Sequence, residues 1–164
     1  MRMQDFERLY AEHAEAMYGF LSYRTGDHGL AEDLLADVFE KAMRARRRFD
    51  GRRGTEKAWL YTIAVNCLRD HQRRAGAEER AIDRHGAHAV AGRARLDPGL
   101  EHVDDRDLVM RSLERLSAEE RDVIALRFGA DLPIAEIARV TGERQTTIEG
   151  RLYRALRKMR ADLG

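Results

Sequence analysis

Apolar residues recur at helical spacing in two stretches of this chain, while the stretch between them, 75–104, shows little such periodicity. The middle stretch is rich in Ala, Gly and His and carries Asp97-Pro98-Gly99 near its end, which is typical of a linker. Only two prolines and 7% aromatic residues among 164 favour helices over strands. We therefore expect an all-α protein in which two small helical domains, 1–75 and 105–164, are joined by a flexible linker over 76–104.

The first domain is expected to hold three helices. Asp27 fits as the N-cap of the second helix and Thr55 as that of the third, since both side chains can accept a hydrogen bond from a helix N-terminus. The second helix ends in the arginine-rich run 44–48, which suits the negative end of the helix dipole. The expected apolar faces comprise Phe6, Leu9, Tyr10, Met17, Phe20 and Leu21, then Leu30, Ala31, Leu34, Leu35, Val38, Phe39 and Ala42, then Leu60, Ile63, Ala64, Cys67 and Leu68.

The outer face of the third helix carries polar groups. At about 100° per residue, Thr62, Asn66, Arg69 and Arg73 share the face opposite the apolar one, with Trp59 at its edge. Donors beside an aromatic ring suit nucleic acid, whereas a solvated face with a half-buried Trp is the structural alternative. The residues alone leave both interpretations open.

The second domain is expected to hold four helices. Ser117 and Glu120 form a capping box at the start of the second of these, and Gly129 is expected to end it. A short helix follows Pro133, and Gly142 separates it from a long last helix. The expected inner residues are Val109, Leu113, Leu116, Val123, Ile124, Leu126, Ile134, Ile137, Ala138, Ile148, Leu152, Ala155, Leu156, Met159 and Leu163.

A short helix, a tight turn with Gly142 and a longer basic helix form a helix-turn-helix pattern. The second helix of such a motif presents small polar groups to base edges and arginines to phosphates. Here its N-terminal end carries Arg144, Gln145, Thr146 and Thr147, and its later turns carry Arg151, Arg154, Arg157 and Lys158. The same pattern also fits plain packing of two helices.

The net charge of +1 hides an uneven distribution. Residues 1–43 carry a net charge of −5 and residues 44–74 one of +7, followed by −2 over 75–104, −2 over 105–141 and +3 over 142–164. Basic blocks of this kind are candidate surfaces for a phosphate backbone, although a solvated helix surface has the same composition. The acidic block 1–43 suits a surface that faces protein.

Several function classes are disfavoured. One cysteine, Cys67, excludes a disulfide framework, and with His71 it forms only an isolated pair, for which a core thiol is the simpler interpretation than a metal or catalytic site. Gly51 and Gly54 flank arginines without the Lys-Ser/Thr of a phosphate-binding loop. No signal-like segment or run of about 18 apolar residues occurs, so we expect a cytoplasmic protein without membrane insertion. We expect no catalytic residue, metal or cofactor.

Two sets of motifs carry a family resemblance. Residues 31–35 through Phe39, 49–51 and 58–66 resemble region 2 of bacterial sigma factors, and residues 116–121, 135–138 and 147–155 resemble their region 4. Two units of these sizes with no region 3 between them resemble the extracytoplasmic-function (ECF) type of the sigma-70 family. The resemblance implies a dissociable, non-catalytic subunit of RNA polymerase.

The resemblance also implies partners and roles. Region 2 would dock on the clamp helices of core RNA polymerase through Glu32, Asp33, Leu35, Asp37, Phe39, Glu40 and Lys41. It would read and melt the −10 element, with flipped bases held by Asp50, Gly51, Arg52, Arg53, Trp59, Thr62, Asn66, Arg69, Arg73 and Arg74. Region 4 would rest on the flap and read the duplex −35 element through Arg144, Gln145, Thr146, Thr147, Glu149, Arg151, Arg154, Arg157 and Lys158. The linker would run toward the RNA exit channel, and an anti-sigma factor is an expected further partner.

The chain departs from the family pattern at four places. Ala36 stands where Gln is frequent, Met43 where Trp is common, and Pro133 where Ser often opens the helix. A frequent Lys-Ser-Arg run appears as Glu149-Gly150-Arg151, so Glu149 is either a base reader or a salt-bridge partner. Two other functions stay open: a helix-turn-helix regulator that binds duplex DNA without polymerase, and an adaptor that binds only a regulator.

Overall fold

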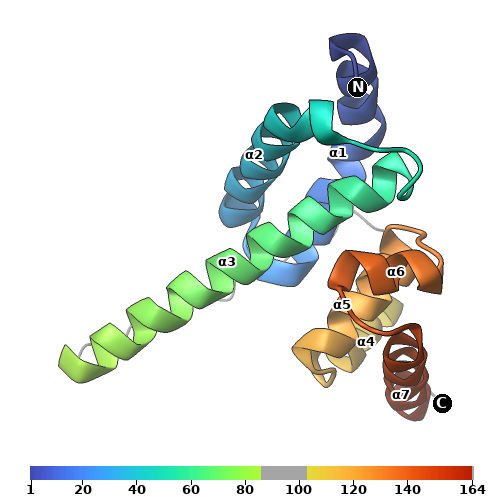
Figure 1. Ribbon diagram of the computed structural model, residues 1–164. Helices are drawn as coiled ribbons and strands as arrows, with labels where there is room; N and C mark the ends of the chain where they lie inside the picture. The colour runs from blue at the N-terminus through green and yellow to red at the C-terminus, as the bar shows by residue number, and fades with distance from the viewer. Residues whose placement is uncertain (86–102, 164) are drawn as a thin grey trace. The chain divides into compact units, whose positions relative to one another are not determined.

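The computed structural model describes residues 1–85 and 103–163, and every element of regular structure within these ranges is a helix (Figure 1). The chain divides into two compact units, Met1–Arg95 and Leu96–Gly164. The expected all-α class with two small helical domains is therefore confirmed. No helix within the described ranges combines the length and the apolar character needed to cross a bilayer.

Unit 1 is built from α1 (Met3–Thr25), α2 (His28–Ala45) and α3 (Glu56–His85), with a short 3-10 turn, η1 (Arg46–Arg48), after α2. Each of the three helices contacts the other two, so their apolar faces share one core. The rings of Phe20 and Tyr61 join α1 to α3 edge to face, with centroids 5.3 Å apart. Burial raises the pKa of Tyr61 to about 12. The largest fully buried side chains here are Leu9, Met17, Leu21, Val38, Leu60 and Tyr61.

The expected caps of unit 1 are confirmed. The Asp27 carboxylate accepts a hydrogen bond from the Leu30 N–H at 3.1 Å, and the Thr55 hydroxyl oxygen accepts one from the Ala58 N–H at 3.1 Å. Helix α1 ends at Gly26, whose φ of 66° lies in the left-handed region that favours glycine. These caps set the two sharp changes of chain direction in the unit.

Helix α3 is longer than the sequence predicts. It continues to His85, ten residues past the expected domain boundary at 75, and Figure 1 shows its C-terminal part projecting beyond α1 and α2. Residues 77–80 of this part are exposed, and apolar periodicity therefore gives no sign that the helix continues through them. Helix α4 begins at Val103, close to the expected start at 105. The rest of the expected linker, 86–102, lies outside the described residues.

Unit 2 holds α4 (Val103–Glu114), α5 (Ala118–Ile124), the π-helical turn η2 (Ala125–Gly129), α6 (Ile134–Thr141) and α7 (Gln145–Leu163). Helix α7 packs on α4, α5 and α6. The capping box is confirmed: the Glu120 N–H donates to the Ser117 hydroxyl oxygen, and the Ser117 N–H to the Glu120 carboxylate, both at 3.1 Å. The buried apolar side chains are Leu116, Val123, Ile124, Ala125, Leu126, Ala130, Leu132, Ile137, Val140, Ile148 and Ala155.

The expected stop at Gly129 takes a different form. The Ala130 N–H donates to the Ala125 carbonyl at 3.0 Å, so the helix widens into a π turn that includes Gly129. The positive φ, 53°, falls on Asp131 instead. Aspartate tolerates this conformation better than most side chains, but Gly129 is the stronger signal in the sequence.

Three residues expected on inner faces are exposed. Tyr10 is 49%, Leu156 40% and Val109 37% exposed within the described chain. Tyr10 lies at the edge of the core and packs edge to face with the ring of Phe39, the centroids being 4.7 Å apart. Leu156 is one position beyond the buried Ala155 and is therefore turned about 100° from the line that faces the core.

Candidate nucleic-acid interface

A short ordered loop, 49–55, joins η1 to α3. The Asp50 carboxylate accepts from the Arg52 N–H at 3.0 Å, and the Arg53 N–H donates to the Asp50 carbonyl at 3.0 Å, so one residue shapes the turn. Gly51, Arg52 and Arg53 are exposed around it. The loop thus presents cationic side chains from a backbone that is fixed by its own hydrogen bonds.

Two aromatic rings flank this loop. The Phe49 and Trp59 rings lie 5.3 Å apart at an interplanar angle of 56°, and both side chains are half-buried. Trp59 is among the residues expected to hold −10 bases, whereas no role was expected for Phe49. Phe49 begins the loop that leads to the helix carrying Trp59, and this position is the feature of the sequence that could have indicated a role for it. Together the two residues form an aromatic pair that joins the start of the loop to the first turn of α3.

The polar stripe on α3 continues from Trp59 along the helix. Asn66, Arg69 and Arg73 are exposed, and Thr62 is half-buried with its hydroxyl donating to the Ala58 carbonyl at 2.9 Å. Arg73 also pairs with Asp70 at 2.6 Å. The structure thus brings these expected residues onto one accessible face. Arg74 is exposed as well, but it lies about 100° around the helix from Arg73.

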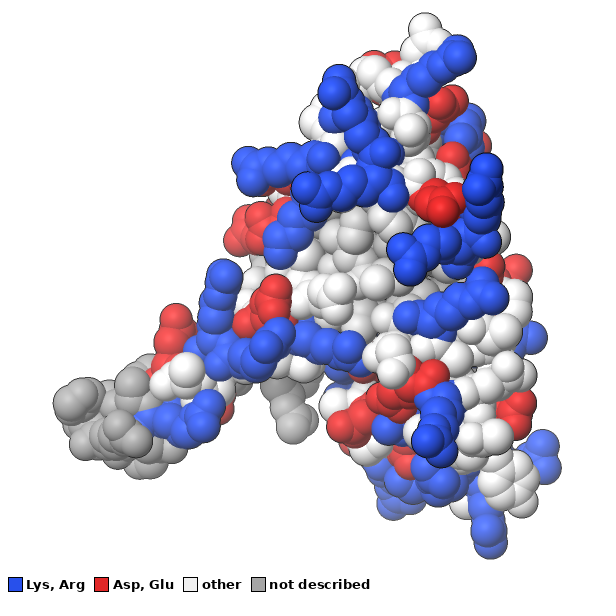
Figure 2. All heavy atoms as spheres, in the orientation of Figure 1, with Lys and Arg blue, Asp and Glu red and all other residues white. Residues whose placement is uncertain are grey.

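The cationic side chains of unit 1 gather on the elements that form this candidate interface. Figure 2 shows Lys and Arg side chains (blue) gathered over the α2–α3 connection and over α3, with uncharged side chains between the two groups. Clustered cationic side chains concentrate a positive potential that attracts a phosphate backbone. The basic block 44–74 of the sequence therefore has a counterpart on the surface of the unit.

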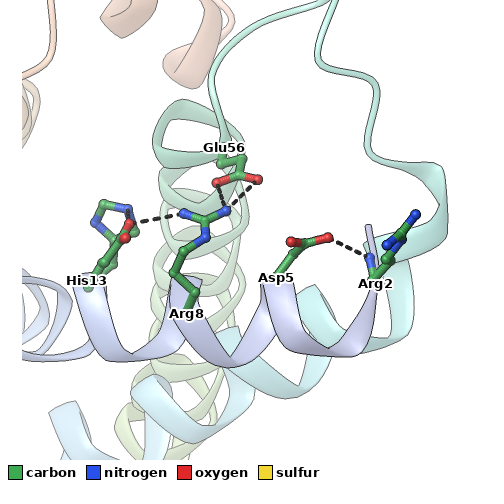
Figure 3. Close-up of polar contacts among 6 residues, drawn as sticks. Arg2, Asp5, Arg8, His13 and Glu56 are labelled. Carbon is green, nitrogen blue, oxygen red and sulfur yellow. Dashed lines mark hydrogen bonds and ion pairs between the residues drawn. The ribbon is translucent and has the colours of Figure 1, made fainter.

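A pair of charged residues braces the start of α3. Arg8 of α1 donates from Nη2 to both carboxylate oxygens of Glu56, at 2.9 and 3.2 Å, and from Nη1 to Glu12 at 3.2 Å (Figure 3). The Glu56 hydrogen bonds raise the pKa of Arg8 above its ordinary value. Burial lowers the pKa of the neighbouring His13. Since Glu56 follows the loop directly, this contact ties the loop to α1, and no sequence pattern indicated it.

The candidate polymerase-binding residues lie on α2 and divide into two kinds. Phe39 is only 6% exposed and packs on Phe6 and Tyr10, so its side chain belongs to the core. Leu35 is half-buried. The remaining candidates are exposed and form a charged surface: Glu32, Asp33, Asp37, Glu40 and Lys41.

In unit 2, α6, the turn and α7 have the geometry of a helix-turn-helix. Gly142 adopts a φ of 75° and its N–H donates to the Ala138 carbonyl at 2.9 Å, which ends α6 as expected. Ile137 of α6 and Ile148 of α7 are fully buried, which fixes the two helices against each other. The first turn of α7 is thereby presented on a rigid support.

Most of the expected −35 residues are accessible on α7. Thr147 is half-buried, and the Gln145 side chain donates to the Glu149 carboxylate at 3.3 Å. Glu149 thus has a hydrogen-bond partner on its own helix one turn earlier, where the sequence left a base contact or a salt bridge open. The exposed residues are Arg144, Gln145, Thr146, Glu149, Arg154, Arg157 and Lys158.

Two of the expected phosphate-binding residues take part in ion pairs within unit 2. Arg151 is half-buried and pairs with Glu143 in the turn. Lys158 Nζ donates to both carboxylate oxygens of Glu120, at 2.9 and 3.1 Å. Burial acts to raise the pKa of Glu120, but the hydrogen bonds from Lys158 and from the Ser117 N–H outweigh it, and this pKa lies below its ordinary value. Arg154 and Arg157 are therefore the more available cations.

Cys67 is a core residue, as the simpler interpretation predicted. Its side chain is 3% exposed, and burial raises the pKa of the thiol. Among the residues that the structure describes, no group of three or more His, Cys, Asp or Glu is placed to hold a metal ion.

Family models match both units. A model described as Sigma-70 region 2 matches residues 9–78, and one described as Sigma-70, region 4 matches residues 106–159. RNA polymerase sigma factor CarQ of Myxococcus xanthus is 32% identical over 163 residues, which cover 97% of this chain and 89% of CarQ. The ECF RNA polymerase sigma factor BldN of Streptomyces coelicolor is 33% identical over 94% of this chain, which spans only 58% of BldN.

Solved structures of similar fold include a sigma factor bound to an anti-sigma factor. The sigma factor RpoE from Bartonella quintana, solved in complex with the anti-sigma factor NepR, superposes with a TM-score of 0.83 at 27% identity over 98% of each chain. CnrH in complex with the cytosolic domain of CnrY gives a TM-score of 0.69 at 26% identity, over 99% of this chain and 89% of CnrH.

Proposed function

The chain belongs to the extracytoplasmic-function (ECF) group of the sigma-70 family, and from this we propose that it directs core RNA polymerase to promoters with a −35 and a −10 element. Sigma factors of this family are non-catalytic subunits, so the proposed activity is recognition and opening of DNA rather than bond-making. The observation that carries the proposal is the accessible stripe Asn66, Arg69 and Arg73 on α3, aligned with Trp59 beside an ordered basic loop.

Unit 1 has the groups that promoter opening requires. Unstacking a base costs a few kcal/mol, and stacking on an aromatic ring returns about 1–3 kcal/mol per base. In this proposal, bases flipped from the −10 element are held between the loop 49–55 and Trp59. Asn66 supplies hydrogen bonds, while Arg69 and Arg73 bind adjacent phosphates in a salt-dependent manner.

Unit 2 is proposed to read the −35 element as duplex. The first turn of α7 enters the major groove with Gln145, Thr146 and Thr147, and Arg154 and Arg157 bind the backbone. Exposure of these side chains, apart from the half-buried Thr147, and the packing of α6 on α7 support this assignment. Because Glu149 already accepts a hydrogen bond from Gln145, we propose that these two residues read one base pair as a unit.

The acidic surface of α2 is proposed to bind the clamp helices of core polymerase. Glu32, Asp33 and Asp37 are exposed, whereas residues 44–74 carry a net charge of +7. Separate surfaces of opposite charge let one small unit contact protein and DNA at the same time, because complementary potentials favour the correct partner.

An anti-sigma factor is a further proposed partner. RpoE, to which this chain is similar, was solved with the anti-sigma factor NepR. Unit 2 also exposes large apolar side chains, Phe128 at 59% and Tyr153 at 67%, which a bound protein would remove from water. Co-purification from native cells should recover a stoichiometric protein other than polymerase subunits, and recovery only as free chain or holoenzyme would contradict this partner.

Run-off transcription with core polymerase tests the proposed function. We expect initiation at a defined start site only when the chain, core polymerase and a two-element promoter are all present. A helix-turn-helix regulator would instead bind the duplex alone and give no stimulated transcript, and an adaptor would give neither result. Either outcome would overturn the proposal.

A further inference from the structure

The connection from the end of α2 to the start of α3 carries positive charge that the roles described above do not use. Residues 41–55 contain seven basic side chains and one acidic side chain, Asp50. The basic residues are Lys41, Arg44, Arg46, Arg47, Arg48, Arg52 and Arg53. Figure 2 shows Lys and Arg side chains gathered at the surface over this connection. Like charges at such a density repel one another, and an anionic partner would relieve that repulsion.

Two of the arginines before the loop have structural partners. Arg44 pairs with Glu40, one turn earlier on α2. Arg46 donates from Nη1 to the Met43 carbonyl at 2.7 Å, which satisfies a carbonyl at the C-terminal end of α2. Cations near a helix C-terminus also stabilise the helix dipole. These two side chains therefore account for the structural use of arginine at the end of α2.

Arg47 and Arg48 have no such use. Both side chains are exposed, and within the part of the chain that the structure describes neither takes part in an ion pair or a side-chain hydrogen bond. Both belong to η1, and Phe49, whose ring lies 5.3 Å from that of Trp59, follows Arg48 directly. Two guanidinium groups without a protein partner thus precede the aromatic pair at the loop 49–55.

We propose that Arg47 and Arg48 bind phosphates of the unpaired DNA strand immediately downstream of the −10 element. This inference rests on the proposed function, in which flipped −10 bases are held between the loop 49–55 and Trp59. Along the chain, α3 is the element that leads from this loop to unit 2, which is proposed to read the upstream −35 element. The strand upstream of the flipped bases therefore follows α3, and the strand downstream of them passes the other end of the loop, where η1 lies.

The chemistry of the segment favours a single strand over a duplex. Proteins that hold single strands combine cationic contacts to the backbone with aromatic rings on which bases stack, and η1 joins both kinds of group at Arg48 and Phe49. Reading a duplex requires an element that fills a groove, whereas η1 is only three residues long. Guanidinium groups bind phosphates whatever the base, so this contact should add affinity without sequence preference.

The test uses holoenzyme and two single-stranded oligonucleotides with the same −10 sequence, one ending at the downstream edge of the element and one extended beyond it by thymines. On the extended oligonucleotide, the double variant Arg47→Ala, Arg48→Ala should reduce the slope of log affinity against log salt by about 1.4, because each phosphate contact on a single strand contributes about 0.7. Arg47→Lys, Arg48→Lys keeps both charges and should retain most of the slope. Arg111→Ala, Arg160→Ala removes two exposed charges from unit 2 and should leave it unchanged.

The shorter oligonucleotide separates the outcomes. There the double alanine variant should bind like the wild-type chain, because the downstream phosphates are missing. An unchanged slope on the extended oligonucleotide, or an equal loss on both, would overturn the inference while wild-type binding kept the proposed function intact. An unchanged slope together with weaker assembly on core polymerase would overturn it as well and assign the two arginines to a protein partner. Failure of the wild-type holoenzyme to bind either oligonucleotide would instead overturn the proposed function itself.

Discussion

Lys158 Nζ donates to both carboxylate oxygens of Glu120, at 2.9 and 3.1 Å, and so joins α7 to the capping box that starts α5. Lys158→Ala should lower the free energy of unfolding of unit 2 by about 1 kcal/mol, because it leaves a buried carboxylate without its cation while the lysine itself is partly in water. Urea denaturation of the full chain measures this. Arg157→Ala, on an exposed residue of the same helix, is the matched control and should change stability little.

The same pair predicts a dependence on pH. The pKa of Glu120 is lowered in the folded chain, so its contribution to stability is present above the ordinary pKa of 4.5 and is lost as the pH falls through the folded value. Glu120→Gln should therefore be less stable than wild type at neutral pH, and the difference should shrink below about pH 4.5. A difference that stayed constant from neutral to acid pH would contradict this role of the carboxylate.

Two glycines predict opposite effects of the same substitution. A Cβ on Gly19, inside α1, would meet nothing within 4 Å, so Gly19→Ala should raise the free energy of unfolding by about 0.5–1 kcal/mol. Gly142 has a φ of 75°, and Gly142→Ala should lower stability by about 1 kcal/mol because alanine is strained there. Thermal unfolding of the two variants beside wild type compares them, and a stabilised Gly142→Ala would refute the turn geometry.

Arg151 and Arg154 lie on the same helix but differ in their partners. Arg151 pairs with Glu143, whereas Arg154 is exposed. On a −35 duplex, Arg154→Ala should reduce the salt slope of holoenzyme binding by about 0.9, and Arg151→Ala should reduce it less because its guanidinium is already neutralised. Equal slopes for the two variants would show that the ion pair opens on DNA.

The sequence predicted most of the fold because the signals are local. Asp27, Thr55 and Ser117 cap helices where their side chains and positions indicated, and the apolar periodicity located both cores. The errors have physical reasons of two kinds. Gly129 was the stronger stop signal, although the chain widened into a π turn and put the positive φ on Asp131. Residues 77–80 of α3 are exposed, so apolar periodicity could not reveal that the helix continues through them.

The site was predicted as a face but not as a set of contacts. Helical spacing alone brought Asn66, Arg69 and Arg73 together, and the structure places them accordingly. The contacts that brace the site join residues far apart in sequence, such as Arg8 with Glu56. A charged side chain gives no sign in the sequence of which distant partner it will meet, so these pairs required the structure.

Promoter opening by unit 1 is the central claim, and permanganate reactivity of unpaired thymines in the −10 element measures it most directly. Holoenzyme with the wild-type chain should give reactive thymines on a cognate promoter. The double variant Trp59→Ala, Asn66→Ala should lose this reactivity while retaining duplex binding through α7, because it removes the indole ring and a donor of the polar stripe on α3. Undiminished opening by the double variant would contradict the account.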